Sequence, residues 1–138
     1  MGNSTRTLYY QSAVIPFRGH HDELEILLVS SRSGKRWVVP KGLVEPDLSA
    51  SESAIKEAYE EAGVEGRLRS DCLGSYSYEK WGGTCEVDVF LFEVKTELDH
   101  WPEMHERKRR WMSLPRAIER VHEPGLKRLL RSVSEHVD

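Results

Sequence analysis

Three glutamates, Glu57, Glu60 and Glu61, lie within one short stretch of the sequence. Residues three and four apart are neighbours on a helix, so their carboxylates would share one side of it. Two like charges about 4 Å apart repel by roughly 4 kcal/mol at an effective dielectric constant of about 20. Hard divalent cations relieve such repulsion, and they can activate water beside a phosphoryl group. The three glutamates alone favour a solvated acidic face relieved by Lys56. Metal-assisted phosphoryl chemistry is the alternative, and the rest of the segment decides between the two.

A helix is predicted to position these glutamates. Ser49 and Glu52 form the S-x-x-E capping box that typically begins a helix. Gly63 supplies the left-handed residue that ends one, so the helix should span Ala50 to Ala62. Four apolar residues share one face at the helical period and should pack against a sheet: Ala54, Ile55, Ala58 and Ala62. The glutamates adjoin this face and should therefore lie at the rim of the core.

The rest of the chain predicts interleaved strands and helices. Aromatic and β-branched residues predict strands at 8–17, 24–29, 37–39, 67–78, 85–93 and 109–112. The first two resemble a hairpin. A helix should begin near Pro115 and cover 116–121, and a helical apolar stripe of Leu126, Leu129, Leu130, Val133 and Val137 ends the chain. This order predicts an α/β or α+β layered sandwich in one domain, residues 1–138.

Composition excludes several classes of protein. The 138 residues include 20 Lys and Arg against 23 Asp and Glu, a net charge of −3, which argues against bulk nucleic-acid binding. No apolar run approaches the roughly 18–20 residues of a transmembrane helix, and the first residues lack the apolar core of a signal peptide. Cys72 and Cys85 have no metal-binding spacing, so we expect ordinary core thiols in a cytoplasmic protein.

The segment from Gly42 to Val64 resembles the signature of the Nudix hydrolases, G-x5-E-x7-R-E-U-x-E-E-x-G-U, where U is a bulky aliphatic residue. Six fixed positions match in register: Gly42, Glu57, Glu60, Glu61, Gly63 and Val64. A pattern of this length is far more specific than a short motif. Three positions depart from it: Leu48 replaces the first glutamate, Lys56 the arginine and Ala58 the bulky aliphatic residue. If that acid and base normally interact, the first two departures are linked.

Further segments resemble one branch of the family, the diphosphoinositol polyphosphate phosphohydrolases. They are Val29–Arg32, the W-x-x-P-x-G pattern of Trp37–Gly42, Glu45-Pro46, and Arg107–Trp111. That branch cleaves phosphoanhydrides in highly phosphorylated inositols and in diadenosine polyphosphates. The resemblance implies a Nudix α/β/α sandwich, in which helices flank a mixed β-sheet.

The resemblance also implies roles for individual residues. The Gly42 carbonyl, Glu57 and Glu61 would hold Mg²⁺, with Mn²⁺ as the other candidate. Glu60 would be a metal ligand or the general base for the attacking water, so Glu57 and Glu60 are the predicted catalytic residues. The family places its base variably, so Glu79, Glu86 and Glu103 are reserve candidates.

A polyphosphate substrate also needs cations for the phosphates that the metal does not reach. The candidates are Arg18, Arg32, Lys35, Arg36, Lys41, Lys80 and Arg107. Arg32 and Arg107 rank first by their match to the branch, and Lys41 ranks high because it adjoins Gly42. Tyr78 and Trp81 flank a Gly82-Gly83 turn, where they could stack on a base; packing is the default for such aromatic residues.

These patterns support three functional hypotheses. The first is a metal-dependent hydrolase of a small-molecule phosphoanhydride. The second is a non-catalytic Nudix-fold module that binds a phosphorylated ligand, a reading that Leu48 and Lys56 favour. The third is an interaction protein that uses its acidic helix without a ligand.

Overall fold

The computed structural model describes residues 6–69 and 71–137. The strands are β1 (Leu8–Arg18), β2 (Glu25–Ser30), β3 (Trp37–Val38), β4 (Lys41–Leu43), β5 (Val64–Leu68), β6 (Gly74–Lys80), β7 (Gly83–Glu97) and β8 (Arg109–Ser113). The helices are α1 (Ala50–Ala62), α2 (Leu114–Arg120) and α3 (Pro124–Arg131), with short 3-10 turns η1 (His21–Glu23) and η2 (Val133–Glu135).

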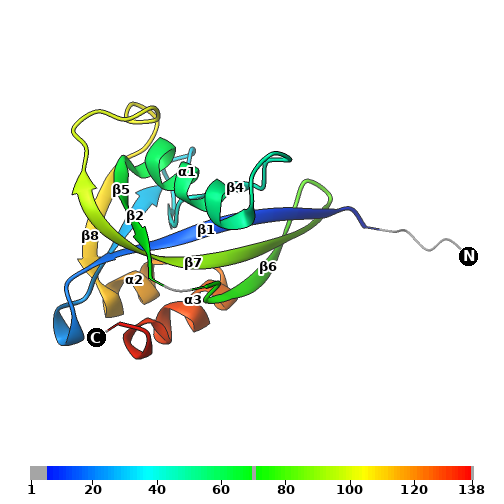
Figure 1. Ribbon diagram of the computed structural model, residues 1–138. Coiled ribbons are helices and arrows are strands. Elements are labelled where there is room, and N and C mark those ends of the chain that lie inside the picture. Colours follow the sequence, from blue (N-terminus) through cyan, green and yellow to red (C-terminus); the bar gives the residue numbers. More distant parts are fainter. Residues whose placement is uncertain (1–5, 70, 138) are drawn as a thin grey trace, which may run out of the picture.

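The strands form one mixed sheet between two helical layers. β1 and β7 run parallel at its centre, with Leu8 opposite Thr84 and Phe17 opposite Glu93. The other strand pairs are antiparallel, including the predicted pairing of β1 with β2. Helix α1 covers one face of the sheet, whereas α2 and α3 cover the other (Figure 1). The predicted α/β/α sandwich is thereby confirmed.

The two cores follow from alternation along β1. Val14 faces α1 and packs with Ala54, Ala58 and Ala62, whose small side chains let the helix lie close to the sheet. The residues on either side of Val14 point to the opposite core, where α3 contributes Leu126 and Leu130. β1 is therefore buried on both faces, as expected for a strand between two layers.

Helix α1 has the bounds that the sequence predicts. Ser49 caps it and accepts a hydrogen bond from the Glu52 backbone, while the Glu52 carboxylate accepts one from the Ser49 backbone. Gly63 ends the helix in the left-handed conformation, with φ of 64°. One part of the predicted apolar face is wrong: Ile55 is 40% exposed, whereas Ala54, Ala58 and Ala62 are buried.

Three other predictions need correction. The segment 67–78 is two strands, β5 and β6, which both pair with β7, with a break between Leu68 and Gly74. The last helix, α3, ends at Arg131 and does not continue to Val137 as the apolar stripe predicts; a 3-10 turn follows it. Cys72 lies in that break and is exposed, so only Cys85 is a core thiol; both are free.

Candidate active site

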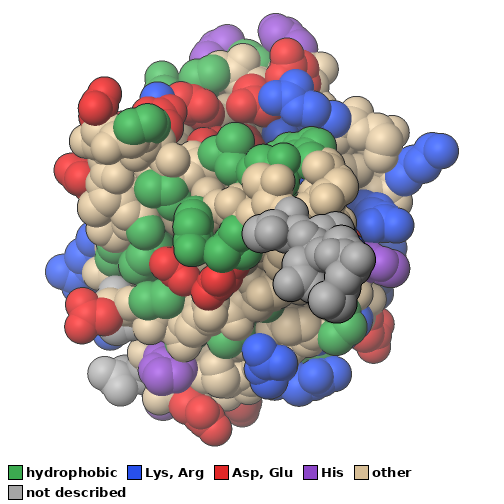
Figure 2. All heavy atoms as spheres, turned by 90° about the vertical axis from the view of Figure 1, so that its right-hand side faces the viewer, with side chains coloured by type: hydrophobic (Ala, Val, Ile, Leu, Met, Phe, Trp, Pro, Cys, Tyr) green, Lys and Arg blue, Asp and Glu red, His purple; other side chains and the backbone are tan. Residues whose placement is uncertain are grey.

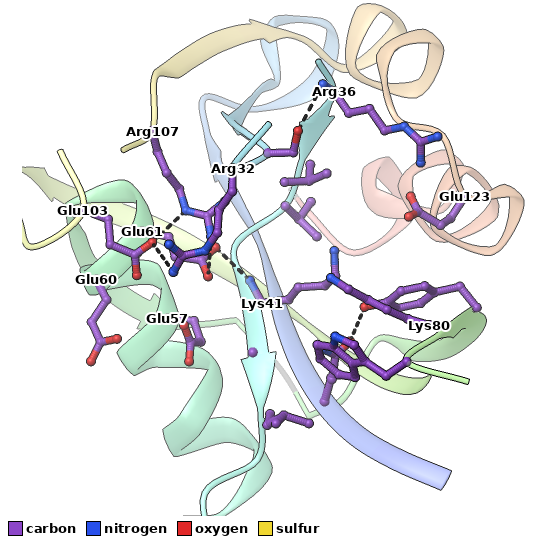
Figure 3. Close-up of a pocket in the computed structure, with 18 of the residues that line it drawn as sticks. Arg32, Arg36, Lys41, Glu57, Glu60, Glu61, Lys80, Glu103, Arg107 and Glu123 are labelled. Carbon is purple, nitrogen blue, oxygen red and sulfur yellow. Dashed lines mark hydrogen bonds and ion pairs between the residues drawn. The ribbon is translucent and has the colours of Figure 1, made fainter. Parts of the chain in front are cut away.

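One cavity of about 610 Å³ brings together most of the side chains that the sequence singles out. Gly42 and the three glutamates of α1 line it, together with five of the seven candidate cations: Arg32, Arg36, Lys41, Lys80 and Arg107. Figure 3 shows the glutamates on one side of Lys41 and Lys80 on the other, with Arg36 and Glu123 above. The cavity therefore has an acidic end and a mixed end rich in cations.

The glutamates sit at different depths. Glu61 is only 5% exposed, and one of its oxygens accepts a hydrogen bond from the Lys41 backbone at 3.2 Å. Glu57 and Glu60 are partly exposed to the cavity. The Glu57 carboxylate lies against Gly42, since a Cβ atom on Gly42 would stand only 2.3 Å from its Oε2. The glycine is thus required for the observed position of Glu57.

The acidic end carries negative charge that the protein only partly compensates. Burial raises the pKa of the Glu61 carboxyl to about 8; nearby Arg107 opposes this rise, and Glu57 adds to it. Burial, followed by repulsion from Glu60, likewise raises the pKa of Glu57. A cation among these carboxylates would favour their ionised forms. Burial lowers the pKa of Lys41, against the attraction of Glu123 and Glu61.

The donor set suits a hard divalent ion. In the described part of the chain, no three His, Cys, Asp or Glu side chains already form a metal-binding group. An ion would therefore have to draw the carboxylates of Glu57, Glu60 and Glu61 closer together. All three offer oxygen atoms, as does the Gly42 carbonyl, and Mg²⁺ and Mn²⁺ prefer oxygen ligands. The residues present fit the ion that the sequence pattern implies.

Arg107 links α1 to the segment before β8. It forms ion pairs with Glu103 at 2.9 Å and Glu61 at 3.4 Å, and it donates a hydrogen bond to the Ser30 carbonyl at 3.0 Å. Its side chain is only 9% exposed. Arg107 therefore has a structural role as well as access to the cavity. Arg32 is freer, since its side chain is 68% exposed while it contacts Glu103.

Lys56 keeps an acidic partner although Leu48 stands at the first glutamate position. Its Nζ lies 2.7 Å from Glu45 Oε1 and 3.7 Å from Glu60 Oε1. Lys56 therefore has a carboxylate partner in Glu45. This pair ties the loop after β4 to α1 beside Glu60.

The mixed end contains residues that the sequence did not single out. Gln11 accepts a hydrogen bond from the Tyr78 hydroxyl at 2.6 Å, and Glu123 lines the cavity from the start of α3. Lys41 Nζ lies 5.3 Å from the centre of the Tyr78 ring. Glu123 comes just before Pro124, and no sequence pattern predicts that it lies in the same cavity as the glutamates of α1. Only the packing of α3 against the sheet brings it here.

Some predicted residues lie elsewhere. Arg18 pairs with Glu25 at 2.8 Å and lies over the Trp111 ring, outside the cavity. Lys35 belongs to an exposed turn and does not line the cavity either. Among the reserve bases, Glu79 and Glu103 line the cavity but Glu86 does not. Glu86 lies opposite Ser77, two residues further from the hairpin turn than the pair of Glu79 and Thr84.

Solved structures define the class of fold. The Ap4A hydrolase of C. elegans, in a binary complex, superposes with a TM-score of 0.79 at 26% sequence identity, covering 92% of this chain and 96% of that one. A NUDIX hydrolase from Nitrosomonas europaea has the same fold at 17% identity, with a TM-score of 0.76. The architecture is that of the Nudix hydrolases.

Sequence comparison gives the family. The NUDIX domain matches residues 9–133, and the chain therefore belongs to the Nudix family. It is 38% identical over 130 residues to Nudix hydrolase 13, mitochondrial, of Arabidopsis thaliana, covering 78% of this chain and 64% of that protein. It is 33% identical over 131 residues to diphosphoinositol polyphosphate phosphohydrolase 3-alpha of Mus musculus, covering 88% of this chain and 79% of that protein.

The chain spans about three-fifths of the length of the first plant relatives, 64%, 62% and 58%. Several of these relatives are named mitochondrial. Among the described residues, no helix is both long enough and apolar enough to span a membrane.

Proposed function

We propose that this chain is a divalent-metal-dependent hydrolase that cleaves a phosphoanhydride bond in a small polyphosphate substrate. The substrate class is that of diadenosine polyphosphates or diphosphoinositol polyphosphates. One observation carries the proposal: a single cavity joins three glutamates and the Gly42 loop to five cationic side chains. Carboxylates are ligands for the metal ion, and Arg and Lys side chains bind phosphates. The cavity therefore contains both kinds of group that this reaction requires.

In the proposed site, the Gly42 carbonyl, Glu57 and Glu61 would hold Mg²⁺, with Glu60 as a further ligand or as the general base, and Mn²⁺ is the alternative ion. When bound, the ion neutralises phosphate charge and makes water a better nucleophile. Glu57 and Glu60 are the proposed catalytic residues. The Glu60 side chain is 32% exposed and lies 3.7 Å from Lys56, and Glu60 is the proposed general base where it does not bind the ion. Glu103 remains a second candidate for the base because it lines the same cavity.

The cations hold and orient the phosphates. Arg32 is mostly exposed and can turn toward a phosphate, whereas Lys41 is fixed between the acidic and the mixed end. Arg36 and Lys80 line the mixed end. Arg107 keeps Glu61 in position and adds positive charge near the scissile bond.

A substrate panel tests this proposal. Diadenosine polyphosphates and diphosphoinositol polyphosphates are incubated with the protein at fixed Mg²⁺, and the products are identified by mass. We expect cleavage of at least one class by the natural chain and a large loss with Glu60→Gln. Failure to cleave any phosphoanhydride, combined with thermal stabilisation by the same compounds, would instead establish the non-catalytic binding module.

We extend the proposal to the whole chain, residues 1–138, as one Nudix domain that acts as a cytoplasmic enzyme. The two free cysteines are consistent with a reducing compartment. No bulk nucleic acid is needed as a partner, since the net charge is −3.

A further inference from the structure

Ser12 of β1 carries a buried hydroxyl group that has no hydrogen-bond partner. The residue is fully buried, and its Oγ atom contacts no donor or acceptor among the described residues. Nearly every buried polar atom of a folded protein has a partner, so an exception requires a physical explanation. The second such atom in the described chain, the Tyr76 hydroxyl, lies in the other core, which α2 and α3 cover.

Strand alternation directs Ser12 toward α1. Residues two apart on a strand point to the same face, and Val14 packs against the alanines of α1. β1 enters the molecule from the end that Figure 2 faces, where hydrophobic side chains are exposed among charged groups. Tyr10 is 59% exposed at this end, whereas Ser12 is 0% exposed. Bulk water therefore does not reach the Ser12 hydroxyl.

The neighbour of Ser12 on β4 is Gly42, directly opposite it in the antiparallel pair. The side chains of directly opposed residues lie on the same face, with Cβ atoms about 4.5–5.5 Å apart. A Cβ atom on Gly42 would stand 2.3 Å from Oε2 of Glu57. The Ser12 hydroxyl and the Glu57 carboxylate therefore both border the space that Gly42 leaves open between the sheet and α1.

Glu57 is the one glutamate of the three that receives no bond from a cation or a backbone N–H of the described residues. Glu61 accepts a hydrogen bond from the Lys41 backbone, and Glu60 lies 3.7 Å from Lys56. Figure 3 draws contacts to Glu61 and none to Glu57. Carboxylates that bind a metal ion are as a rule hydrogen-bonded themselves, because these bonds fix their orientation. A donor is thus missing at Glu57, beside a hydroxyl that is unused.

We propose that Ser12 is a positioning residue, which donates a hydrogen bond to the Glu57 carboxylate when the divalent ion is bound. In the described chain the three glutamates do not yet form a metal-binding group, so they must move closer together to hold an ion. One oxygen of Glu57 then turns to the ion, and the other accepts the bond from Ser12. This inference deepens the proposed function and rests on its metal site.

Asp88 is the competing acceptor for the Ser12 hydroxyl. It lies directly opposite Ser12 on β7, so its carboxylate is on the same face of the sheet. Asp88 is partly exposed and does not line the cavity, and Ser12 forms no hydrogen bond to it. Asp88→Asn is therefore the matched control, because it changes the other carboxylate beside Ser12 and leaves the glutamates of α1 intact.

Two measurements on the natural chain, Ser12→Ala, Asp88→Asn and the double variant test the inference. Electron paramagnetic resonance gives the Kd of Mn²⁺, and thermal unfolding in EDTA gives the Tm of the ion-free protein. We expect Ser12→Ala to raise the Kd of Mn²⁺ by about 10- to 100-fold, the usual effect of removing a partner of a metal ligand. Its Tm in EDTA should equal or exceed the natural value, because the ion-free protein loses an unsatisfied hydroxyl. Asp88→Asn should keep the natural Kd, and Ser12→Ala should have the same effect in that background.

The inference is overturned if Ser12→Ala leaves the Kd of Mn²⁺ unchanged, or if it lowers the Tm in EDTA, since the hydroxyl would then act without the ion. It is also overturned if Asp88→Asn removes the effect of Ser12→Ala on the Kd. An unchanged Kd in Ser12→Ala, with Mn²⁺ bound by the natural chain, refutes this inference alone. Absence of Mn²⁺ binding by the natural chain refutes the proposed function as well.

Discussion

Gly42→Ala should reduce the rate of catalysis far more than it reduces the stability of the fold. The new Cβ would lie 2.3 Å from Glu57 Oε2, where ordinary contacts begin at 3.4 Å. The carboxylate must therefore move by about 1 Å, and a misplacement of about 1 Å in an active site can cost about 100-fold in rate. The atom displaced is the end of a flexible side chain, so we expect only about 0.5–1.5 kcal/mol of destabilisation, the cost of an off-rotamer side chain.

Two measurements on the same preparations test this prediction. One is kcat at saturating Mg²⁺ on the best substrate of the panel, and the other is the free energy of unfolding from urea titration. Gly74→Ala is the matched control, because its Cβ would lie 2.6 Å from the Leu129 Cδ2 atom in the core. We expect this control to lose stability and keep kcat. The reasoning is wrong if Gly42→Ala keeps nearly full kcat, or if both variants lose activity in proportion to the stability they lose.

Three further predictions concern the elements around the site. Glu45→Gln should lower kcat by removing the partner of Lys56, and adding Leu48→Glu should restore it; if the second change has no effect, Glu45 does not replace the missing glutamate. Arg107→Lys should destabilise the fold by about 1–3 kcal/mol in urea titration, since the single nitrogen of lysine cannot reach the three partners that the three guanidinium nitrogens contact. Hydrogen bonds from Ser49 lower the pKa of Glu52, so that carboxylate stabilises the fold above its unfolded pKa of 4.5 and loses this effect as pH falls through its lower folded value. Glu52→Ala should thus lower the Tm at pH 7 but hardly at acidic pH, and an equal loss at both pH values would contradict this.

Local sequence signals predicted the positions of the glutamates well. Ser49, Glu52 and Gly63 determine where α1 begins and ends through contacts within a few residues, so the helix bounds could be read directly. The cavity end opposite the glutamates was harder to predict. Gln11 and Glu123 reach it only through the parallel pairing of β1 with β7 and the packing of α3, which join distant parts of the chain.

The errors have a common physical cause. Ile55 has the right spacing for the apolar face of α1, yet it is 40% exposed. Cys72 is a residue type that is usually buried, but it falls in the break between β5 and β6. Periodicity and residue type describe what a side chain favours, whereas burial depends on which element packs over it.

The central claim is that one turn of α1 holds a divalent cation for hydrolysis. The most direct test is a titration with Mn²⁺ in which electron paramagnetic resonance measures the free ion. We predict saturable binding to the natural chain, binding retained in Glu65→Gln, whose exposed carboxylate lies outside the cavity, and binding lost when Glu57, Glu60 and Glu61 are all replaced by Gln. Equal Mn²⁺ affinity in the natural chain and the triple variant would contradict the account.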